Sequence, residues 1–190
     1  WEAFSHGAET VFYFRWRQVS FAQEQMHAGL LRPDNVATEV FGEIESVIKE
    51  LADAPAVSSI QAPFALLFDY DADFVWGVQP HGAGLSYFGL VFDWYRSLRK
   101  LGLSIDILPA INRDFEGYQL IVVPGMIHMP ADLKNALSNT SPEVILGLRT
   151  CARDENFKIS IPLPLNLPNS DFSVVRVQSL RPDMPIKLKM

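Results

Sequence analysis

The sequence predicts an α/β fold: an open parallel sheet of doubly wound type with helices on both faces. Short apolar runs at 64–68, 104–108 and 120–123 have the length and character of strands that are covered on both sides. Between the first two runs, apolar residues recur at helical spacing from Leu85 to Leu101. Strands that alternate with helices in this way are typical of a parallel sheet.

The first sixty residues lack this alternation. Residues 10–16 are β-branched and aromatic with apolar side chains on both faces, which predicts a covered strand, although no similar segment lies near enough to pair with it. Residues 17–37 are polar and interrupted by glycine and proline, so we expect a loop. Helical spacing then predicts an amphipathic helix with Glu39 and Glu43 near its start, which Asp53 and Pro55 end and from which a linker follows. Its apolar positions are Val40, Phe41, Ile44, Val47, Ile48 and Leu51.

The second part of the chain begins with the strand 64–68, which runs into an acidic turn at 69–73. A helix over 85–101 comes next, and Gly102 stands where a left-handed helix cap would be placed. After the strand 104–108 the chain continues toward the strand 120–123, which ends in Pro124-Gly125.

Two more elements complete the predicted sheet. Pro130 can occupy the first turn of a helix that runs to about Leu137, and 144–146 supplies a fourth strand. The tail from residue 161 is rich in proline, so we expect it to be extended, with an edge strand at 173–177.

Composition excludes several classes of function. A net charge of -6, with Lys and Arg scattered along the chain, lacks the basic patch that nucleic-acid binding needs. No apolar run approaches the roughly 18 residues of a membrane-spanning helix, so no membrane partner is expected. Cys151 is the single cysteine, which excludes an internal disulfide and fits a cytoplasmic location. The chain opens at Trp1 without an initiator Met or signal peptide, and we expect it to be a piece of a longer protein.

Two stretches together resemble glycoside hydrolase family 42, the β-galactosidases. The first joins Ser5–Ala8, Val11–Gln18 and Glu24–His27, and it is similar to the closing strand of the family's catalytic barrel and the loop after it. The second runs from about Phe64 to Leu180 and is similar to the family's middle domain; it includes the segments Ala65–Tyr70, Tyr87–Gly102 and Tyr118–Pro124.

The resemblance implies two domains. Residues 1–58 would be the C-terminal end of the catalytic (β/α)8 barrel, its last strand and helix. Residues 61–183 would be the β-galactosidase trimerisation domain, whose open parallel sheet is flavodoxin-like or glutamine-amidotransferase-like. The parent enzyme would be a retaining hydrolase of terminal non-reducing β-D-galactose residues, without a cofactor or metal, and a homo-oligomer, a trimer in most of the family.

The resemblance also implies roles for particular residues. Glu24 and His27 match the family's galactose-binding pair, and both can hydrogen-bond to neighbouring hydroxyls of one pyranose. Arg15, Trp16 and Arg17 would support that pair from the strand end, with an ordinary ion pair at the end of a barrel strand as the alternative. The two catalytic glutamates would lie upstream of Trp1, so the chain alone would carry no catalytic residue and would be inactive.

Two departures from the family pattern bear on the site. Family members commonly carry glycines just before the glutamate, where this chain has Phe21, Ala22 and Gln23. In addition, Gly147-Leu-Arg-Thr150 matches the family's Gly-Pro-Arg turn only in part. The paths of the loop 19–23 and of the chain after residue 147 therefore stay open.

Three other site chemistries fit the residues of the second domain less well. Asp69 and Asp71 follow a strand as in aspartate-dependent phosphatases, but neither of the next strands is followed by a Ser or Thr, and a hydrogen-bonded acidic turn is the alternative. Glutamine amidotransferases carry a cysteine at the elbow after the third strand, where this chain reads Pro124-Gly-Met-Ile-His128. Gly82-Ala-Gly84 lacks a preceding strand and so predicts no phosphate loop.

The aromatic content of the second domain indicates a surface for other subunits. Seven rings are more than one face of a short helix buries within its own domain: Phe74, Trp76, Tyr87, Phe88, Phe92, Trp94 and Tyr95. Trp76 and Trp94 are the candidate subunit contacts, with ordinary core positions as the alternative. A free-standing, non-catalytic α/β interaction module is the second hypothesis for the whole chain.

Overall fold

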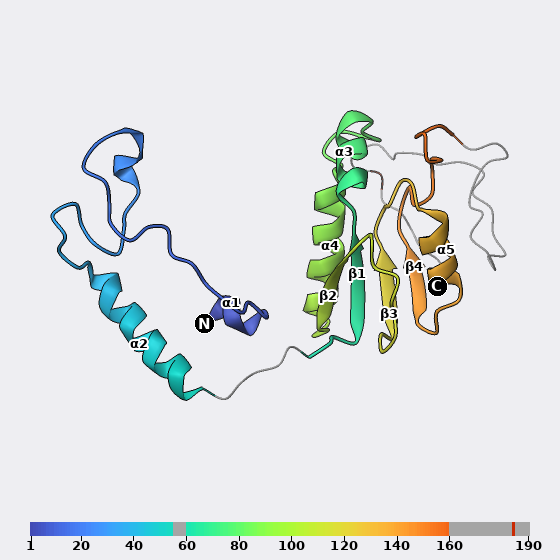
Figure 1. Cartoon of the computed structure of the whole chain (residues 1–190). Helices are drawn as coiled ribbons and strands as arrows, with labels where there is room; N and C mark the ends of the chain where they lie inside the picture. The colour runs from blue at the N-terminus through green and yellow to red at the C-terminus, as the bar shows by residue number, and fades with distance from the viewer. Residues whose placement is uncertain (55–59, 160–183, 185–190) are drawn as a thin grey trace. The chain divides into compact units, whose positions relative to one another are not determined.

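The computed structural model describes residues 1–54, 60–159 and 184. The chain divides into two compact units, Trp1–Ile60 and Gln61–Met190 (Figure 1). Among the described residues, no helix combines the length and the apolar content needed to cross a membrane.

The first unit contains the helices α1 (Glu2–Ser5) and α2 (Glu39–Asp53) and the short 3-10 helix η1 (Gln23–Met26). The bounds of α2 confirm the helix predicted from the apolar spacing. One face of α2 is half-buried, and Phe41 on this face packs edge-on against Trp16 with ring centres 5.9 Å apart.

The strand predicted at 10–16 is wrong for this structure. No strand forms there, and the segment's end is marked only by an isolated bridge between Arg17 and Leu31. A strand persists when neighbouring strands take up its backbone N–H and C=O groups, and the described part of residues 1–60 offers no such neighbour. Phe12 and Phe14 are accordingly exposed.

Within its described residues, the second unit is built on a parallel sheet of four strands in the order β2-β1-β3-β4, which confirms the predicted open parallel sheet. Its strands are β1 (Phe64–Phe68), β2 (Ile105–Pro109), β3 (Leu120–Val123) and β4 (Glu143–Leu146). Leu66 of β1 lies opposite Ile107 of β2 and Val122 of β3. The chain passes from β1 to one side for β2 and returns to the other side for β3, which makes the β1–β3 junction the switch point of the sheet.

Three helices cover the sheet: α3 (Tyr70–Val78), α4 (Tyr87–Lys100) and α5 (Ala131–Ser138). The acidic turn expected at 69–73 is instead the start of α3, because Asp69 caps the helix by accepting hydrogen bonds from the backbone N–H groups of Asp71 and Ala72. Gly102 follows α4 with φ of +80°, the left-handed conformation predicted for it.

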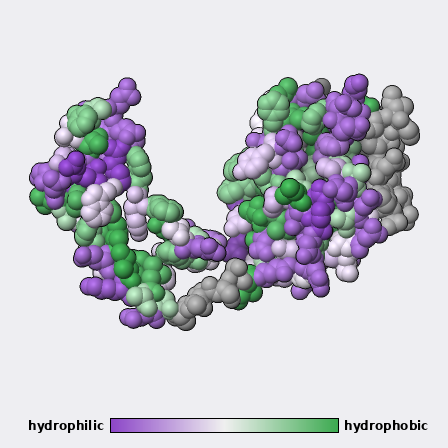
Figure 2. Space-filling view, in the orientation of Figure 1, coloured by the Kyte–Doolittle hydropathy of each residue, from purple (hydrophilic) through white to green (hydrophobic). Residues whose placement is uncertain are grey.

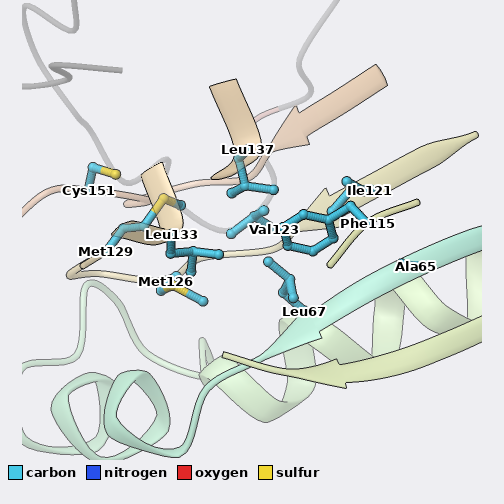
Figure 3. Close-up of a cluster of buried hydrophobic side chains, with 10 residues drawn as sticks. All are labelled: Ala65, Leu67, Phe115, Ile121, Val123, Met126, Met129, Leu133, Leu137 and Cys151. Atoms are coloured by element: carbon cyan, nitrogen blue, oxygen red, sulfur yellow. The ribbon is translucent and has the colours of Figure 1, made fainter. Parts of the chain in front are cut away.

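Alternate residues of β1 point into two separate cores, one on each face of the sheet. Ala65 and Leu67 pack with Leu133 and Leu137 of α5 (Figure 3). Leu66 packs on the other face with buried residues of α3 and α4, namely Ala72, Val75, Trp76, Tyr87 and Val91. Helices on both faces confirm the doubly wound prediction. The edge strand predicted at 173–177 lies outside the described residues.

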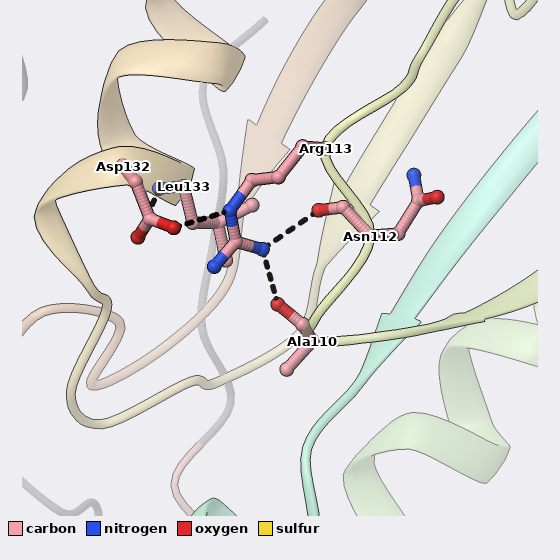
Figure 4. A network of polar contacts seen from close by, with 5 residues as sticks. All are labelled: Ala110, Asn112, Arg113, Asp132 and Leu133. Atoms are coloured by element: carbon pink, nitrogen blue, oxygen red, sulfur yellow. Dashed lines mark hydrogen bonds and ion pairs between the residues drawn. The ribbon is translucent and has the colours of Figure 1, made fainter.

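A polar network fixes the loop after β2 to the start of α5 (Figure 4). Arg113 donates from Nε to Asp132 at 2.9 Å and from one terminal nitrogen to the carbonyl oxygens of Ala110 and Asn112 at 2.7 and 2.8 Å. The hydrogen bond from Arg113 holds the pKa of Asp132 below its usual value. This contact joins the loop that follows the C-terminal end of β2 to the N-terminal end of α5.

Candidate functional site

The segment that carries Glu24 and His27 is a closed loop of residues 18–29. Three backbone hydrogen bonds join its two ends: Leu30 N–H to Arg15 O at 2.9 Å, Leu31 N–H to Trp16 O at 2.8 Å and Gln18 N–H to Leu31 O at 2.9 Å. Gly29 lies where these ends meet, and a Cβ atom there would stand 2.5 Å from the backbone nitrogen of Gln18. Glycine is therefore required at this crossing, and the loop is a compact one whose ends are close together.

Side chains inside the loop hold its backbone in place. Gln18 donates from Nε2 to the carbonyl of Gln25 at 2.6 Å, and Gln25 donates from Nε2 to the carbonyl of Ala22 at 2.6 Å. Ala22 has φ of 67° and ψ of -166°, a conformation that belongs almost entirely to glycine. The position at which the sequence departs from the family's glycines thus keeps a glycine-like backbone.

Glu24 is held by an arginine from the segment before the loop. The guanidinium of Arg15 forms an ion pair with the carboxylate of Glu24; the Arg15 side chain is 12% exposed and that of Glu24 57% exposed. Arg15 also lies over the ring of Phe14, 4.6 Å from its centre, and the same ring meets His27 edge-on at 6.1 Å. The loop therefore brings Glu24 and His27 to one small cluster around Phe14 and Arg15, with Glu24 reaching solvent.

The other two residues expected to support the site make different contacts. Arg17 donates to the side-chain oxygen of Asn35 at 2.9 Å, and Trp16 packs on α2. Beside them lies a hollow of about 540 Å³; its lining is Phe14, Arg15, Trp16, Arg17, Val19 and Asn35. Sequence reasoning did not single out Asn35 or Phe14, because the only local signal is a turn after Pro33 and an apolar pattern.

Asp69 in the second unit serves as a helix cap. Its carboxylate is engaged by the first turn of α3, and its own N–H donates to the hydroxyl of the buried Tyr87 at 3.0 Å. Burial raises the pKa of Asp69, and the backbone N–H of Asp71 opposes this rise. Within the described residues no group of three or more metal-binding side chains exists. These contacts favour the hydrogen-bonded alternative over a phosphatase-like site.

The elbow after β3 carries no nucleophile. Pro124 through Ile127 are buried, and His128 is half-buried with Nδ1 lacking a hydrogen-bond partner among the described residues. Cys151 is 3% exposed, and burial raises the pKa of its thiol to about 11. A protonated, buried thiol is inert, so Cys151 is a core residue.

The structure separates the two tryptophans that were predicted to contact other subunits. Trp76 is only 1% exposed, and its indole N–H donates to the carbonyl of Gly125 at 3.0 Å. The expectation for Trp76 is corrected, because a side chain buried in the core of its own unit offers no surface to a neighbour. Trp94 is half-buried against the same core, and its contact with another subunit stays a prediction.

Comparison with known proteins agrees with both units. The family model described as "Beta-galactosidase trimerisation domain" matches residues 62–190, and the model described as "Beta-galactosidase" matches residues 1–54. The β-galactosidase BgaA of Thermus sp is 44% identical over 189 residues, which cover 97% of this chain and 29% of that protein. The β-galactosidase Bga of Halorubrum lacusprofundi is 34% identical over 86% of this chain and 24% of its own length.

Solved structures give the same result. The β-galactosidase of the psychrophilic Marinomonas ef1 matches with a TM-score of 0.71 and 38% identity, over 86% of this chain and 26% of that one. The polyextremophilic β-galactosidase of the haloarchaeon Halorubrum lacusprofundi matches with a TM-score of 0.76 and 33% identity, over 84% and 24%. The chain thus spans less than a third of the length of these relatives, and it belongs to the β-galactosidases of glycoside hydrolase family 42.

Proposed function

We propose that the chain works as part of a retaining β-galactosidase that hydrolyses terminal non-reducing β-D-galactose residues. Residues 1–60 supply part of the galactose-binding loop, and residues 61–190 assemble the subunits into a trimer. The relatives named β-galactosidases support the activity, and the family model for a trimerisation domain supports the assembly. The single cysteine supports a cytoplasmic location.

The observation that carries the sugar-binding role is the ion pair between Arg15 and Glu24 on a closed loop. A carboxylate that is fixed by a guanidinium keeps a free oxygen that can accept hydrogen bonds from sugar hydroxyls. His27 lies on the same loop and adds a second polar group at the Phe14 ring.

Bond cleavage is assigned to groups outside this chain. Retaining hydrolysis needs two carboxyl groups about 5 to 5.5 Å apart, one as nucleophile and one as acid and base. The carboxylate of Glu24 is held by its ion pair with Arg15. We therefore give Glu24 a binding role, and we expect the isolated chain to show no turnover.

A chimera tests the proposal. The chain replaces the aligned 29% of the Thermus β-galactosidase BgaA, and turnover of an aryl β-galactoside is measured for the chimera and for the chain alone. We expect the chimera to be active and the chain alone to be inactive. Glu24→Gln and His27→Asn should raise KM in the chimera at least about tenfold each, since each removes a hydrogen bond to the substrate.

Glu39→Gln is the matched control, because Glu39 is an exposed carboxylate in the first turn of α2. It should leave KM unchanged. Two outcomes would overturn the assignment. One is turnover by the isolated chain, and the other is a folded and active chimera whose KM does not change when Glu24 and His27 are substituted.

A further inference from the structure

The two helices on one face of the sheet carry large apolar side chains on their outer sides. Tyr70, Phe74 and Val78 follow one another at intervals of one turn along α3 and are 82%, 72% and 65% exposed. Phe88 and Phe92 are one turn apart on α4 and are 62% and 49% exposed. Each helix therefore has an outer apolar stripe in addition to the side that packs on the sheet.

The two stripes meet at Phe68, the last residue of β1. Its ring lies 4.9 Å from that of Tyr70 and 6.5 Å from that of Phe88. We call the whole set the aromatic face: Phe68, Tyr70, Phe74, Val78, Phe88 and Phe92. Figure 2 shows green, hydrophobic side chains on the part of this unit where Figure 1 draws α3 and α4.

Apart from Phe68, which also packs against the core, the residues of the aromatic face lie outside the core of their own unit. The same helices already bury other side chains against the sheet, among them Val75 and Trp76 from α3 and Tyr87 and Val91 from α4. Exposed aromatic residues gathered at one place are uncommon on monomeric proteins, because each square ångström of apolar surface covered contributes about 25 cal/mol. Aromatic residues are also the type enriched at subunit interfaces.

We infer that a second copy of this chain docks on the aromatic face. The inference rests on the assembly role proposed above, since the whole face lies within residues 62–190, which match the trimerisation-domain family. It replaces the buried Trp76 of the sequence prediction by the outer residues of α3 and α4, and the predicted contact of Trp94 is unaffected.

The charges beside the aromatic face suit a second copy of the chain. Asp71 on α3 and Asp93 on α4 are exposed, and Asp93 pairs with Arg96 of its own helix. The guanidinium of Arg96 lies over the ring of Phe92, 5.6 Å from its centre, so charges of both signs border the aromatic face. A second copy carries the same two signs of charge and can pair with them across the contact.

Association of the full 190-residue chain tests the inference. Sedimentation and light scattering over the micromolar range give the association constant of the wild type and of the double variant Phe74→Gln/Phe88→Gln. We expect that constant to fall at least about tenfold for each ring removed, because buried aromatic rings dominate interface energies. Leu101→Gln is the matched control: Leu101 is 73% exposed but lies at the far end of α4, and this variant should associate like the wild type.

Three outcomes separate the hypotheses. Association that weakens in the double variant but not in the control, with unchanged circular dichroism, supports docking on the aromatic face. The inference is overturned if the wild type stays monomeric, or if the double variant associates as strongly as the wild type. This readout needs no sugar. If the chain associates through the aromatic face but the chimera is inactive, the glycosidase proposal fails and the docking inference is still supported.

Discussion

Arg15 and Glu24 form an ion pair that fastens the closed loop to the segment before it. The Arg15 side chain is nearly buried, whereas Glu24 reaches solvent. In the proposed function, the arginine therefore acts on sugar binding through the carboxylate it holds. Arg15 is a positioning residue in the proposed function.

The Arg15 pair predicts a defect in substrate binding. Arg15→Lys loses the planar guanidinium that lies over Phe14 and pairs with Glu24. We expect KM of the chimera to rise about tenfold. Arg32→Lys is the control, since Arg32 pairs with Asp34 on the exposed surface and should leave KM as it is. Equal KM values for the two variants would contradict the positioning role.

The backbone conformation of Ala22 predicts that glycine at this position would make the folded chain more stable. Its φ of 67° with ψ of -166° suits glycine, so Ala22→Gly should relieve strain and raise the free energy of unfolding by about 1 kcal/mol. Ala28→Gly in the same loop has no positive φ to relieve and should lower it slightly. Denaturant unfolding of both variants measures the difference, and a loss of stability in Ala22→Gly would refute the strain.

Arg149 predicts a stability defect in the second unit. Its guanidinium lies over Trp76, 4.6 Å from the ring centre, and donates to the carbonyl of Gln79 at 3.0 Å, so it ties the turn after β4 to the end of α3. Arg149→Lys should lower the free energy of unfolding by about 1 to 2 kcal/mol, because an ammonium does not stack in this way. Arg153→Lys, whose guanidinium bonds only the adjacent Ala152 carbonyl among the contacts described, should cost much less.

The chain after β4 approaches the chain after β3 closely at Gly147, and this predicts that a larger residue there is destabilising. A Cβ atom on Gly147 would collide with the carbonyl of Pro124, while the N–H of Gly147 donates to Val123 at 2.7 Å. Gly147→Ala should lower the free energy of unfolding by about 2 kcal/mol or more, since backbone must move. Gly77→Ala within α3 meets nothing within 4 Å and should raise it by about 0.5 kcal/mol. A thermal melt that ranks the two variants the other way would disprove the packing.

Cys151 predicts a loss of stability in alkali. Burial raises the pKa of its thiol to about 11 in the folded chain from an ordinary value of 9.0. The folded state then keeps the proton when the unfolded state has lost it, so about 3 kcal/mol of stability that is present below pH 9 disappears between pH 9 and 11. Cys151→Ala should flatten this part of the curve in urea unfolding under reducing conditions. The pKa of Tyr118, which burial and Asp106 raise to about 12, should leave a further decline above pH 10 in both proteins.

Local pattern by itself predicted most of the second unit. The strands at 64–68 and 120–123 agree with β1 and β3 in their bounds, because apolar periodicity depends only on neighbours in the chain. The same periodicity predicted the helix α2 of the first unit. The parallel order of the sheet followed from the alternation of strands and helices. The family resemblance added Glu24 and His27 as candidates, which no composition or spacing would have singled out.

Contacts between distant residues decided the rest. The helix α3 was read as a turn because its apolar residues lie on both its buried and its exposed side, and only the capping by Asp69 and the packing on the sheet show where it begins. The segment 10–16 has the residues of a strand, but among the described residues its backbone is hydrogen-bonded only at its end, where Arg15 and Trp16 accept from Leu30 and Leu31. Burial of Trp76, exposure of Phe74 and the pairing of Arg15 with Glu24 depend on which surfaces meet in three dimensions, and a one-dimensional pattern carries no record of that.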